Sequence, residues 1–326
     1  MRPLKRKVLT TGPADDSAAP YRDQWAWRRI GLTAAWDRLR AMRGPSSAEE
    51  PVTVAILDSG LQRDHTAFER IRAGLSRDRV IPPADGDLGD DDGHGTMLAG
   101  TIAGIVNDPR GGRGAVPPVR LLAVKFIDVC TPPTSDNAAR AVRRAVAAGA
   151  RVINASWDLG LNNPALRRAI EDAEDRGVLV VVAAGNNGGN NGDYPVFPAS
   201  LKLPNVISVM ATDANDEKPD FSNYGGTVDI AAPGVNIVSA FPYIRRSPES
   251  HDLAYRLYSG TSPAAAHVSG AAALLLTINP GWTPGEIRER LMASVDPVPA
   301  LRRFCRAGGR LNLHNAVNSA LAGLAG

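Results

Sequence analysis

Three residues of the sequence are of the types that activate a serine for nucleophilic attack. Asp58 ends the apolar run VTVAILD, His94 lies in DDDGHGT, and Ser262 lies in YSGTSPAAAHVSG. Taken singly, each has an ordinary interpretation: a turn cap, a residue of a helical first turn, and a helix cap with proline at the next position. Taken together, a serine, a histidine that removes its proton and a buried carboxylate that orients the imidazole are the groups that acyl transfer requires. Asp58, His94 and Ser262 are therefore a candidate catalytic triad.

A fourth residue could stabilise the negative charge that forms during such an attack. Asn186 lies in VVVAAGNNG, on a glycine-flanked turn after an apolar run. A side-chain amide there can donate to a developing oxyanion, together with the backbone N–H of Ser262, and losing one such donor costs about 2.7–4 kcal/mol of barrier. Considered alone, Asn186 is also compatible with a plain Asn-Gly turn.

The elements that must position these residues are indicated by the apolar pattern. Residues 52–58 are apolar on both faces and too few for a helix, which predicts a buried parallel strand. Further strands are predicted at 119–126, 151–156, 178–184, 205–211, 227–232 and 236–240, and helices within 21–43 and at about 96–106, 136–150, 164–177, 262–278, 284–294 and 312–323. Strands that alternate with helices predict an α/β fold of three layers, with a mostly parallel sheet between helices. Ligands of such sheets bind beyond the carboxyl ends of the strands, where all four candidate residues fall.

Composition and length narrow the class of protein. The chain has 326 residues, 44% of them hydrophobic, and a net charge of +3, which gives little support for nucleic-acid binding. No linker follows residue 51, so we predict a flexible arm over residues 1–20 and a single domain over residues 21–326. No nucleotide-binding glycine motif follows a predicted strand. The two cysteines, Cys130 and Cys305, form no CxxC pair, which argues against a zinc or redox framework, and a disulfide between them is left open.

Localisation is predicted from the N-terminal segment. It is basic but lacks an apolar stretch, so the sequence as given has no secretory signal, and no run reaches the roughly 18 apolar residues typical of a membrane span. We therefore expect a cytoplasmic protein without a membrane partner. Secretion is the alternative if a leader precedes the given sequence.

The motifs DSG (58–60), HGT (94–96) and GTSPAAAHVSG (260–270) resemble the signature blocks of the subtilisin-like serine proteases, the subtilases or peptidase S8 family. The order Asp, His, Ser is that of subtilisin. VINAS, PNVISV, FSNYGGTVDIAAPG and GRLNLHNAV match as well, so the resemblance covers about residues 24–318. It implies a seven-stranded, mostly parallel sheet and a serine endopeptidase that hydrolyses polypeptides, expected to be monomeric. It also implies that Asp58, His94 and Ser262 are the triad and that Asn186 is the oxyanion donor.

The resemblance further implies a substrate-binding edge. Ser156, Trp157 and Asp158 would pair with the substrate and border the pocket for the P1 residue, which precedes the scissile bond, and Ala184 and Gly185 complete the predicted set. Asp158 stands where the family usually has glycine. We expect it to narrow the pocket or to favour a basic P1 residue, with a solvent-exposed carboxylate of no such role as the alternative.

Three other stretches bear on specificity and cofactors. The run 90–92 could favour basic residues near P2 or could form a solvated acidic loop. Pro263 stands where the family usually has methionine, which removes an oxidisable sulfur beside the nucleophile. No cofactor is expected to be required, and structural calcium is weakly supported: Ala67 replaces the family's usual aspartate, 107–114 matches poorly, and 84–93 is oxygen-rich but lacks EF-hand spacing.

Two rival functions are kept open. A catalytically inactive, subtilase-like binding module is one, although the presence of all four chemical residues argues against it. A transpeptidase or macrocyclase that matures peptides by the same acyl transfer is the other.

Overall fold

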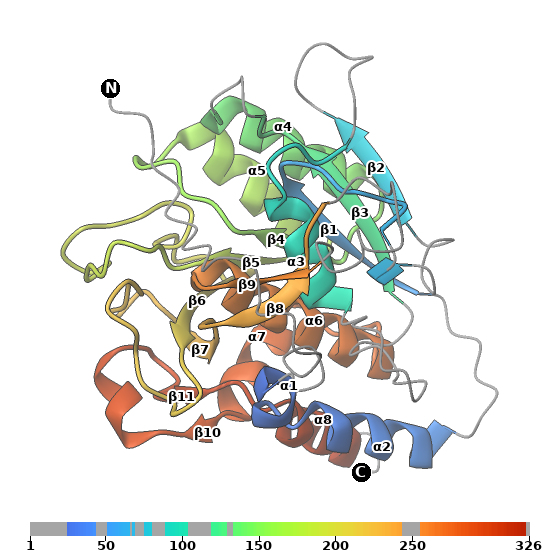
Figure 1. Cartoon of the computed structure of the whole chain (residues 1–326), viewed down its shortest axis with the longest axis vertical. Coiled ribbons are helices and arrows are strands. Elements are labelled where there is room, and N and C mark those ends of the chain that lie inside the picture. Colours follow the sequence, from blue (N-terminus) through green and yellow to red (C-terminus); the bar gives the residue numbers. More distant parts are fainter. Residues whose placement is uncertain are drawn as a thin grey trace.

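The computed structural model describes residues 25–43, 51–65, 67–68, 75–79, 89–103, 119–128, 133–242 and 255–323. The predicted arm over residues 1–20, residue Cys130 and the loop 107–114 lie outside these residues. Figure 1 shows a central sheet between two layers of helices, which is the predicted three-layer α/β architecture.

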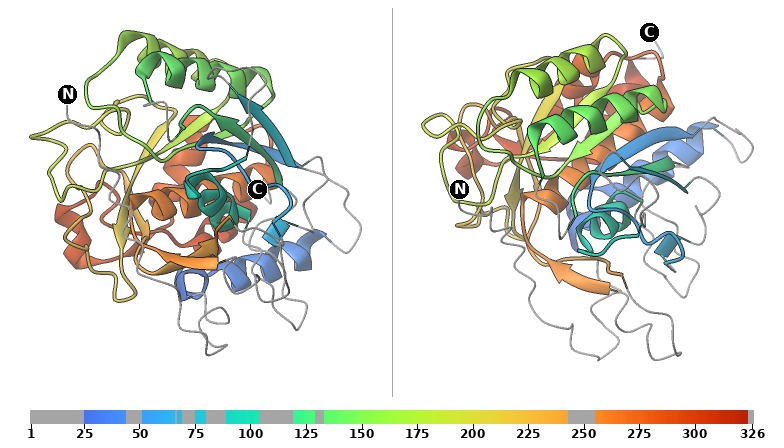
Figure 2. Two further views of the ribbon diagram at one scale, coloured as in Figure 1. Left: turned by 45° about the horizontal axis from the view of Figure 1, so that its top comes forward. Right: turned by 90° about the horizontal axis from the view of Figure 1, so that it is seen from above.

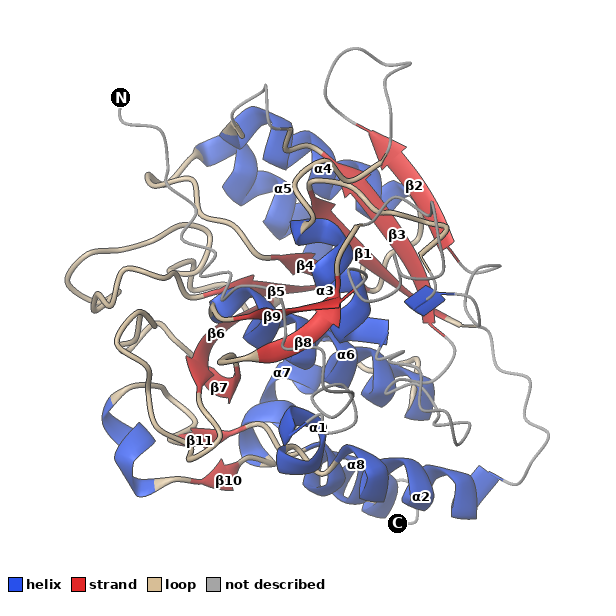
Figure 3. Ribbon diagram, in the orientation of Figure 1, coloured by secondary structure: helices blue, strands red, loops and turns tan. Residues whose placement is uncertain are grey.

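The central sheet contains nine strands among the described residues. Every neighbouring pair is parallel except the first, which is antiparallel. In spatial order the strands are β10 (Asp296–Pro297), β11 (Gly309–Arg310), β7 (Ile230–Pro233), β6 (Val206–Thr212), β5 (Leu179–Ala183), β4 (Val152–Ala155), β1 (Val52–Asp58), β3 (Val119–Lys125) and β2 (Leu75–Arg79). Figure 3 shows them as one continuous twisted sheet.

Seven of these strands have four or more residues and run parallel, which agrees in number with the predicted sheet but differs in membership. Strand β2 is not among the predicted strands, because its residues LSRDR contain no apolar run. The predicted strand at 236–240 is β8 (Ile237–Ala240), which instead pairs with β9 (Tyr255–Tyr258) in a separate antiparallel hairpin. The two-residue strands β11 and β10 extend the sheet beyond β7.

Successive side chains of the buried strands point to opposite faces of the sheet and pack in two different hydrophobic cores. In β1, Val54 and Ile56 pack with α3 (His94–Ala103), α6 (Thr261–Ile278) and α8 (Leu313–Ala322). Ala55 and Leu57 point to the opposite core, which contains α4 (Ser135–Ala147) and α5 (Pro164–Glu174). Figure 2 shows α4 and α5 side by side on their face of the sheet.

The helices begin where the sequence supplies caps. The side chains of Thr134, Asn163 and Asn312 accept backbone N–H bonds at the starts of α4, α5 and α8. Thr283 and Glu286 form a reciprocal capping box at the start of α7 (Pro284–Ala293). The predicted helices are thus present within a few residues of their expected ends. The 3₁₀ helix η4 (Pro299–Arg303) lies between β10 and β11.

Helix α6 is the central helix of the fold. It packs against β4, β5, β6, β7 and α3, and 17 of its 18 residues are buried. Its length and apolar composition would suffice to cross a membrane, but its whole length is enclosed by the protein, so these properties reflect its place in the core. The helices at the N-terminal end, α1 (Trp25–Arg29) and α2 (Leu32–Arg43), lie beside α8 in Figure 1, and α2 packs on it.

Candidate active site

The first pair of candidate residues is hydrogen bonded in the interior. Asp58 is the last residue of β1 and is fully buried, and His94 is the first residue of α3 and is 4% exposed. His94 Nδ1 lies 2.9 Å from Asp58 Oδ1. Because a carboxylate only accepts, this contact assigns the proton to Nδ1 and leaves Nε2 as a proton acceptor. The same Asp58 oxygen also accepts the Ser59 N–H at 2.8 Å, so the turn-cap interpretation of Asp58 holds together with the chemical one.

The position of α3 depends on a residue that the sequence analysis did not single out for this role. Asp90 accepts hydrogen bonds from the Ser59 hydroxyl at 2.7 Å, from Gly93 N at 2.8 Å and from Thr96 N at 2.7 Å. Asp90 is buried, so the expectation of a solvated acidic loop is wrong for this residue. Its carboxylate caps the first turn of the helix that carries His94 and ties that turn to the turn after Asp58.

A glycine allows the same two turns to approach each other. A Cβ at Gly95 would collide with the Gly60 carbonyl oxygen, and the Gly95 N–H donates to the Ser59 hydroxyl at 3.0 Å. The glycine of the HGT motif is therefore required for backbone contact between α3 and the turn after β1. This contact brings the imidazole within reach of Asp58.

Ser262 lies in the first turn of α6. The helix begins at Thr261 with Gly260 as its N-cap, so the expectation that Ser262 is the cap and Pro263 the first helical residue is wrong by two positions. Pro263 is the third helical residue, and its missing N–H is still one of the groups without an intrahelical acceptor. The N–H of Ser262 is another such group and is available to an anion at the helix start.

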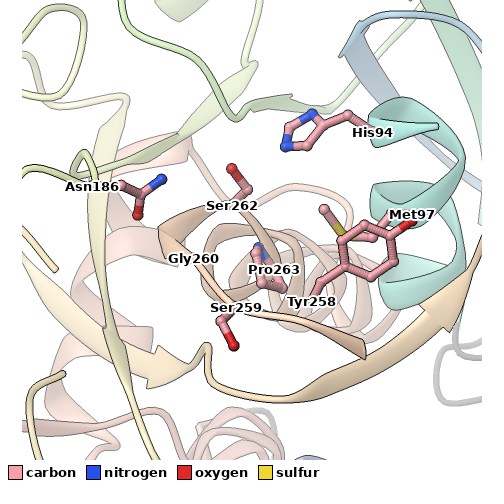
Figure 4. Close-up of a pocket in the computed structure, with 8 residues that line it drawn as sticks. All are labelled: His94, Met97, Asn186, Tyr258, Ser259, Gly260, Ser262 and Pro263. Carbon is pink, nitrogen blue, oxygen red and sulfur yellow. The ribbon is translucent and has the colours of Figure 1, made fainter. Parts of the chain in front are cut away.

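His94, Ser262 and Asn186 meet at one pocket (Figure 4). It is lined by His94, Met97, Asn186, Tyr258, Ser259, Gly260, Ser262 and Pro263. The imidazole and the Ser262 hydroxyl face each other across it. The hydroxyl makes a long contact of 3.5 Å with the Ser156 carbonyl oxygen instead of a hydrogen bond with His94. Hydrogen bonds between a nucleophile and its base are commonly long or poorly aligned in enzymes without substrate and tighten when substrate binds.

Asn186 lies on the other side of Ser262 and is oriented by the residue between them. Its Oδ1 accepts both the backbone N–H of Thr261, at 2.8 Å, and the Thr261 hydroxyl, at 3.0 Å. With the oxygen held in this way, the NH₂ group is directed toward the pocket, as Figure 4 shows. The Asn186 amide and the Ser262 N–H thus supply two donors beside the hydroxyl. Sequence reasoning did not identify Thr261 as the residue that sets this orientation.

The predicted substrate-binding stretch after β4 is only partly available to a ligand. Ser156 is buried and does not line the pocket, but its carbonyl oxygen lies 3.5 Å from the Ser262 hydroxyl. The Trp157 indole is buried: its Nε1 donates to the Leu57 carbonyl at 2.9 Å and its ring packs edge-on against Phe126. Any contact of Trp157 with a substrate must therefore come from its backbone.

Asp158 is half-buried rather than solvent-exposed. Burial raises the pKa of its carboxyl, and a hydrogen bond from the Gly160 backbone opposes that rise. No positively charged partner is among the causes of this pKa shift. A cation brought by a ligand would therefore find a carboxylate that is partly desolvated.

Ala184 and Gly185 follow the carboxyl end of β5. Ala184 N donates to Val209 O at 2.9 Å, which continues the pairing with β6 by one residue. Gly185 has φ of 111°, and a Cβ there would collide with the Asn223 side chain, so glycine is required at this turn. Asn223 also accepts the N–H groups of Asn187 and Gly189 and thereby fixes the loop that carries Asn186.

The calcium prediction rests largely on stretches outside the described residues, namely 107–114 and 84–88, so it stays a prediction. No group of three or more His, Cys, Asp or Glu side chains in the described part is arranged to hold a metal ion. Ala67 is buried and offers no side-chain oxygen. Cys305 is a buried, free thiol among the described residues, and burial raises its pKa.

Comparisons with known proteins show the family of the chain. The subtilase family model, Peptidase_S8, matches residues 49–316. Subtilisin Savinase of Lederbergia lenta is 36% identical over 267 residues, which cover 82% of this chain and 89% of the relative. Thermitase of Thermoactinomyces vulgaris is 33% identical over 296 residues, which cover 90% and 95%. The alkaline protease of Shouchella clausii is 36% identical, and the chain spans 63% of its length.

A solved protease structure has a similar fold. The structure of a protease from Pseudoalteromonas arctica has a TM-score of 0.73 and 27% sequence identity, and the likeness covers 92% of this chain and 97% of that one. The chain therefore belongs to the subtilase family, and it is a serine-type endopeptidase with polypeptide substrates.

Proposed function

We propose that the chain cleaves peptide bonds through a triad of Asp58, His94 and Ser262 with an oxyanion hole formed by Asn186 and the Ser262 N–H. One observation carries the proposal. An imidazole hydrogen bonded to a buried carboxylate at 2.9 Å faces, across one pocket, a serine in the first turn of a buried helix. A nucleophile, its base and the residue that orients the base are thus supplied by three separate elements.

In the acylation step, Ser262 Oγ attacks the carbonyl carbon of the scissile bond while His94 Nε2 takes the hydroxyl proton. Asp58 keeps the proton of Nδ1 in place and stabilises the imidazolium. The Asn186 amide and the Ser262 N–H donate to the oxyanion of the tetrahedral intermediate. The imidazolium then protonates the leaving amine, the C–N bond breaks, and an acyl ester remains on Ser262.

In the deacylation step, water attacks the ester carbonyl and gives a proton to His94 Nε2. The second tetrahedral intermediate collapses by returning that proton to Ser262 Oγ, which releases the carboxylic acid and restores the enzyme. If an amine attacks in place of water, the product is a ligated peptide when the amine belongs to a second peptide and a cyclic peptide when it belongs to the acyl chain itself. All the groups needed for these steps belong to the chain, so we propose that the reaction requires no cofactor.

The wider setting of the enzyme is also part of the proposal. We infer that residues 21–326 act as one peptidase domain and that the enzyme works as a monomer, because a single copy of the chain supplies the nucleophile, the base, the orienting carboxylate and both oxyanion donors of the proposed chemistry. Neither a nucleic acid nor a membrane has a role in the chemistry above. Of the two predicted locations, similarity to subtilisins such as Savinase favours the secreted one over the cytoplasmic one.

A peptide-library digest of the wild type and the Ser262→Ala variant, read by mass spectrometry, tests the function. We expect internal peptide bonds to be cut by the wild type and cleavage to fall by about 10⁶-fold in the variant. Cleavage that survives in Ser262→Ala would refute the assignment. A folded wild type that cuts nothing would support the inactive binding module, and products longer than the substrates would support the ligase alternative.

We further propose that Asp158 favours a basic P1 residue. The half-buried carboxylate would gain a charge-assisted partner in an arginine or lysine side chain. Because burial raises its pKa, the preference should fade with decreasing pH earlier than it would for an ordinary aspartate. The same digest, repeated with Asp158→Gly, measures the frequencies of Arg, Phe and Leu at P1, and equal frequencies in the two enzymes would rule out this role.

A further inference from the structure

A chain of buried hydrogen bonds runs beneath the nucleophile and has no place in the mechanism above. The Ser269 hydroxyl donates to Asn154 Oδ1 at 2.9 Å, and Asn154 Nδ2 donates to the Ser156 hydroxyl at 2.9 Å. The Ser156 hydroxyl in turn donates to the carbonyl oxygen of Ser262 at 3.3 Å. Ser269 and Asn154 are fully buried and Ser156 is 5% exposed, so water cannot readily replace any member.

The sequence spacing explains why these side chains meet. Ser262 and Ser269 are seven residues apart, which is two turns of α6, so they lie on the same face of the helix. Asn154 and Ser156 are two residues apart, which places them on the same face at the end of β4. Helix α6 packs against β4. The four residues therefore form a closed path from the nucleophile, down two turns of helix, across to the strand and back.

The path has a single direction. A serine hydroxyl has one proton, and Ser156 uses it on the Ser262 carbonyl, so the Ser156 oxygen must accept from Asn154. The Asn154 amide then presents its oxygen to Ser269, which is the only donor to this oxygen among the described residues. Removing one member leaves the next without its partner in a buried place, where an unmade hydrogen bond is costly.

We propose that Ser269, Asn154 and Ser156 are positioning residues for Ser262. The proposal rests on the proposed function. The network ends on the carbonyl of the nucleophile itself and so fixes the first turn of α6 relative to β4. The same turn orients both the Ser262 hydroxyl toward His94 and the Ser262 N–H toward the oxyanion. A small displacement there lowers the rate of the chemical step, since reacting groups must be held close to their productive geometry.

The test compares Ser269→Ala, Asn154→Ala and Ser156→Ala with a matched control. Thr277→Val also removes a buried hydroxyl from α6, but that hydroxyl bonds to Leu274 O at the far end of the helix. The amount of competent enzyme is fixed by titration with a fluorophosphonate, so kcat is expressed per active site and partial unfolding does not enter. Global stability is measured in parallel by denaturant unfolding.

We expect kcat per active site to fall about tenfold in Ser269→Ala, which corresponds to about 1.4 kcal/mol of barrier. KM should stay within about twofold, because Ser269 lies two turns of helix away from the nucleophile and is not one of the predicted substrate-binding residues. Thr277→Val should lose stability but keep its kcat. In the Ser156→Ala background, adding Ser269→Ala should produce little further loss, because the path to Ser262 is already cut.

Two results would overturn the inference: a kcat in Ser269→Ala equal to that of wild type, or losses that add fully in the double variant. Should Asn154→Ala fail to fold, the Ser269 and Ser156 variants decide the question, because alanine fits wherever serine does. Failure of the proposed function is a separate outcome, since it would appear as activity that does not depend on Ser262. If activity requires Ser262 but the network variants keep the wild-type kcat, the proposed function stands and the positioning role of the network is refuted.

Discussion

The imidazole of His94 is oriented before any substrate arrives. Asp58 Oδ1 accepts hydrogen bonds from both Ser59 N and His94 Nδ1. The bond from Ser59 holds the carboxylate in place, and the bond from His94 orients the imidazole ring. The Asn186 side chain is oriented in the same way. Thr261 donates two hydrogen bonds to its oxygen, which leaves its NH₂ group for the oxyanion. In both side chains, the atom that takes no direct part in the reaction, His94 Nδ1 or Asn186 Oδ1, makes the hydrogen bonds that position the side chain.

The residues with chemistry could be predicted from the sequence, and those that support them mostly could not. Serine, histidine and aspartate at strand and helix ends are informative because their chemical types are needed together. Asp90 was hidden in an acidic run that is also typical of a solvated loop, and its burial follows from the fold of the whole loop. The partners of Asn154 likewise depend on packing between α6 and β4, which no local pattern reveals.

At the scale of elements, the site is built where three of them end close together. Asp58 is the last residue of β1, His94 is the first residue of α3, and Ser262 lies in the first turn of α6. The approach of α3 to the turn after β1 is set by backbone contact at Gly95, and the Gly95 N–H is bonded to Ser59. The geometry of the triad therefore depends on a position that carries no functional group.

The Gly95→Ala variant tests this dependence. Its Cβ would force α3 away from the Gly60 carbonyl, and we expect about a hundredfold loss of kcat/KM, the size that a displacement of about 1 Å can cause. The matched control is Gly285→Ala in α7, where the added Cβ meets nothing within 4 Å. The control should retain full activity in steady-state assays. Equal activity of the two variants would contradict the role of close approach.

The elements themselves were predictable to the extent that burial leaves a pattern. The central strands and the amphipathic helices have such patterns. The edge strand β2 reads LSRDR, because only part of an edge strand must be apolar, and it was missed. Residues 237–240 are apolar enough for the central sheet yet form a hairpin with β9, since their pairing is decided by the chain that follows.

At the scale of the whole molecule, a buried histidine links stability to pH. His267 lies in α6, and its Nδ1 is 3.1 Å from the Pro233 carbonyl oxygen. Burial lowers its pKa from an ordinary value of 6.5 to about 4, against the opposing effect of the Pro233 and Pro263 carbonyls. The folded protein thus holds the ring neutral at a pH where the unfolded chain would protonate it.

The sign of the effect follows from proton binding. Between about pH 6.5 and pH 4 the unfolded chain binds a proton at this position that the folded protein does not, so the free energy of unfolding falls as pH decreases, by up to about 3 kcal/mol. Denaturant unfolding in a Ser262→Ala background, which prevents self-digestion, measures it. The stability difference between that protein and its His267→Gln derivative should be constant above about pH 6.5 and shift against the histidine form below it. A difference that stays constant down to pH 4 would show that His267 does not cause this effect.

The central claim is that Ser262 is activated by His94 and Asp58, and the site of a fluorophosphonate adduct tests it most directly. The probe is incubated with folded protein, and the modified residue is located by peptide mapping with mass spectrometry. The account predicts one adduct per molecule, on Ser262, formed by the wild type and absent from Ser262→Ala, with labelling slowed strongly in His94→Ala. An adduct on another residue, or equal labelling rates in wild type and His94→Ala, would contradict it.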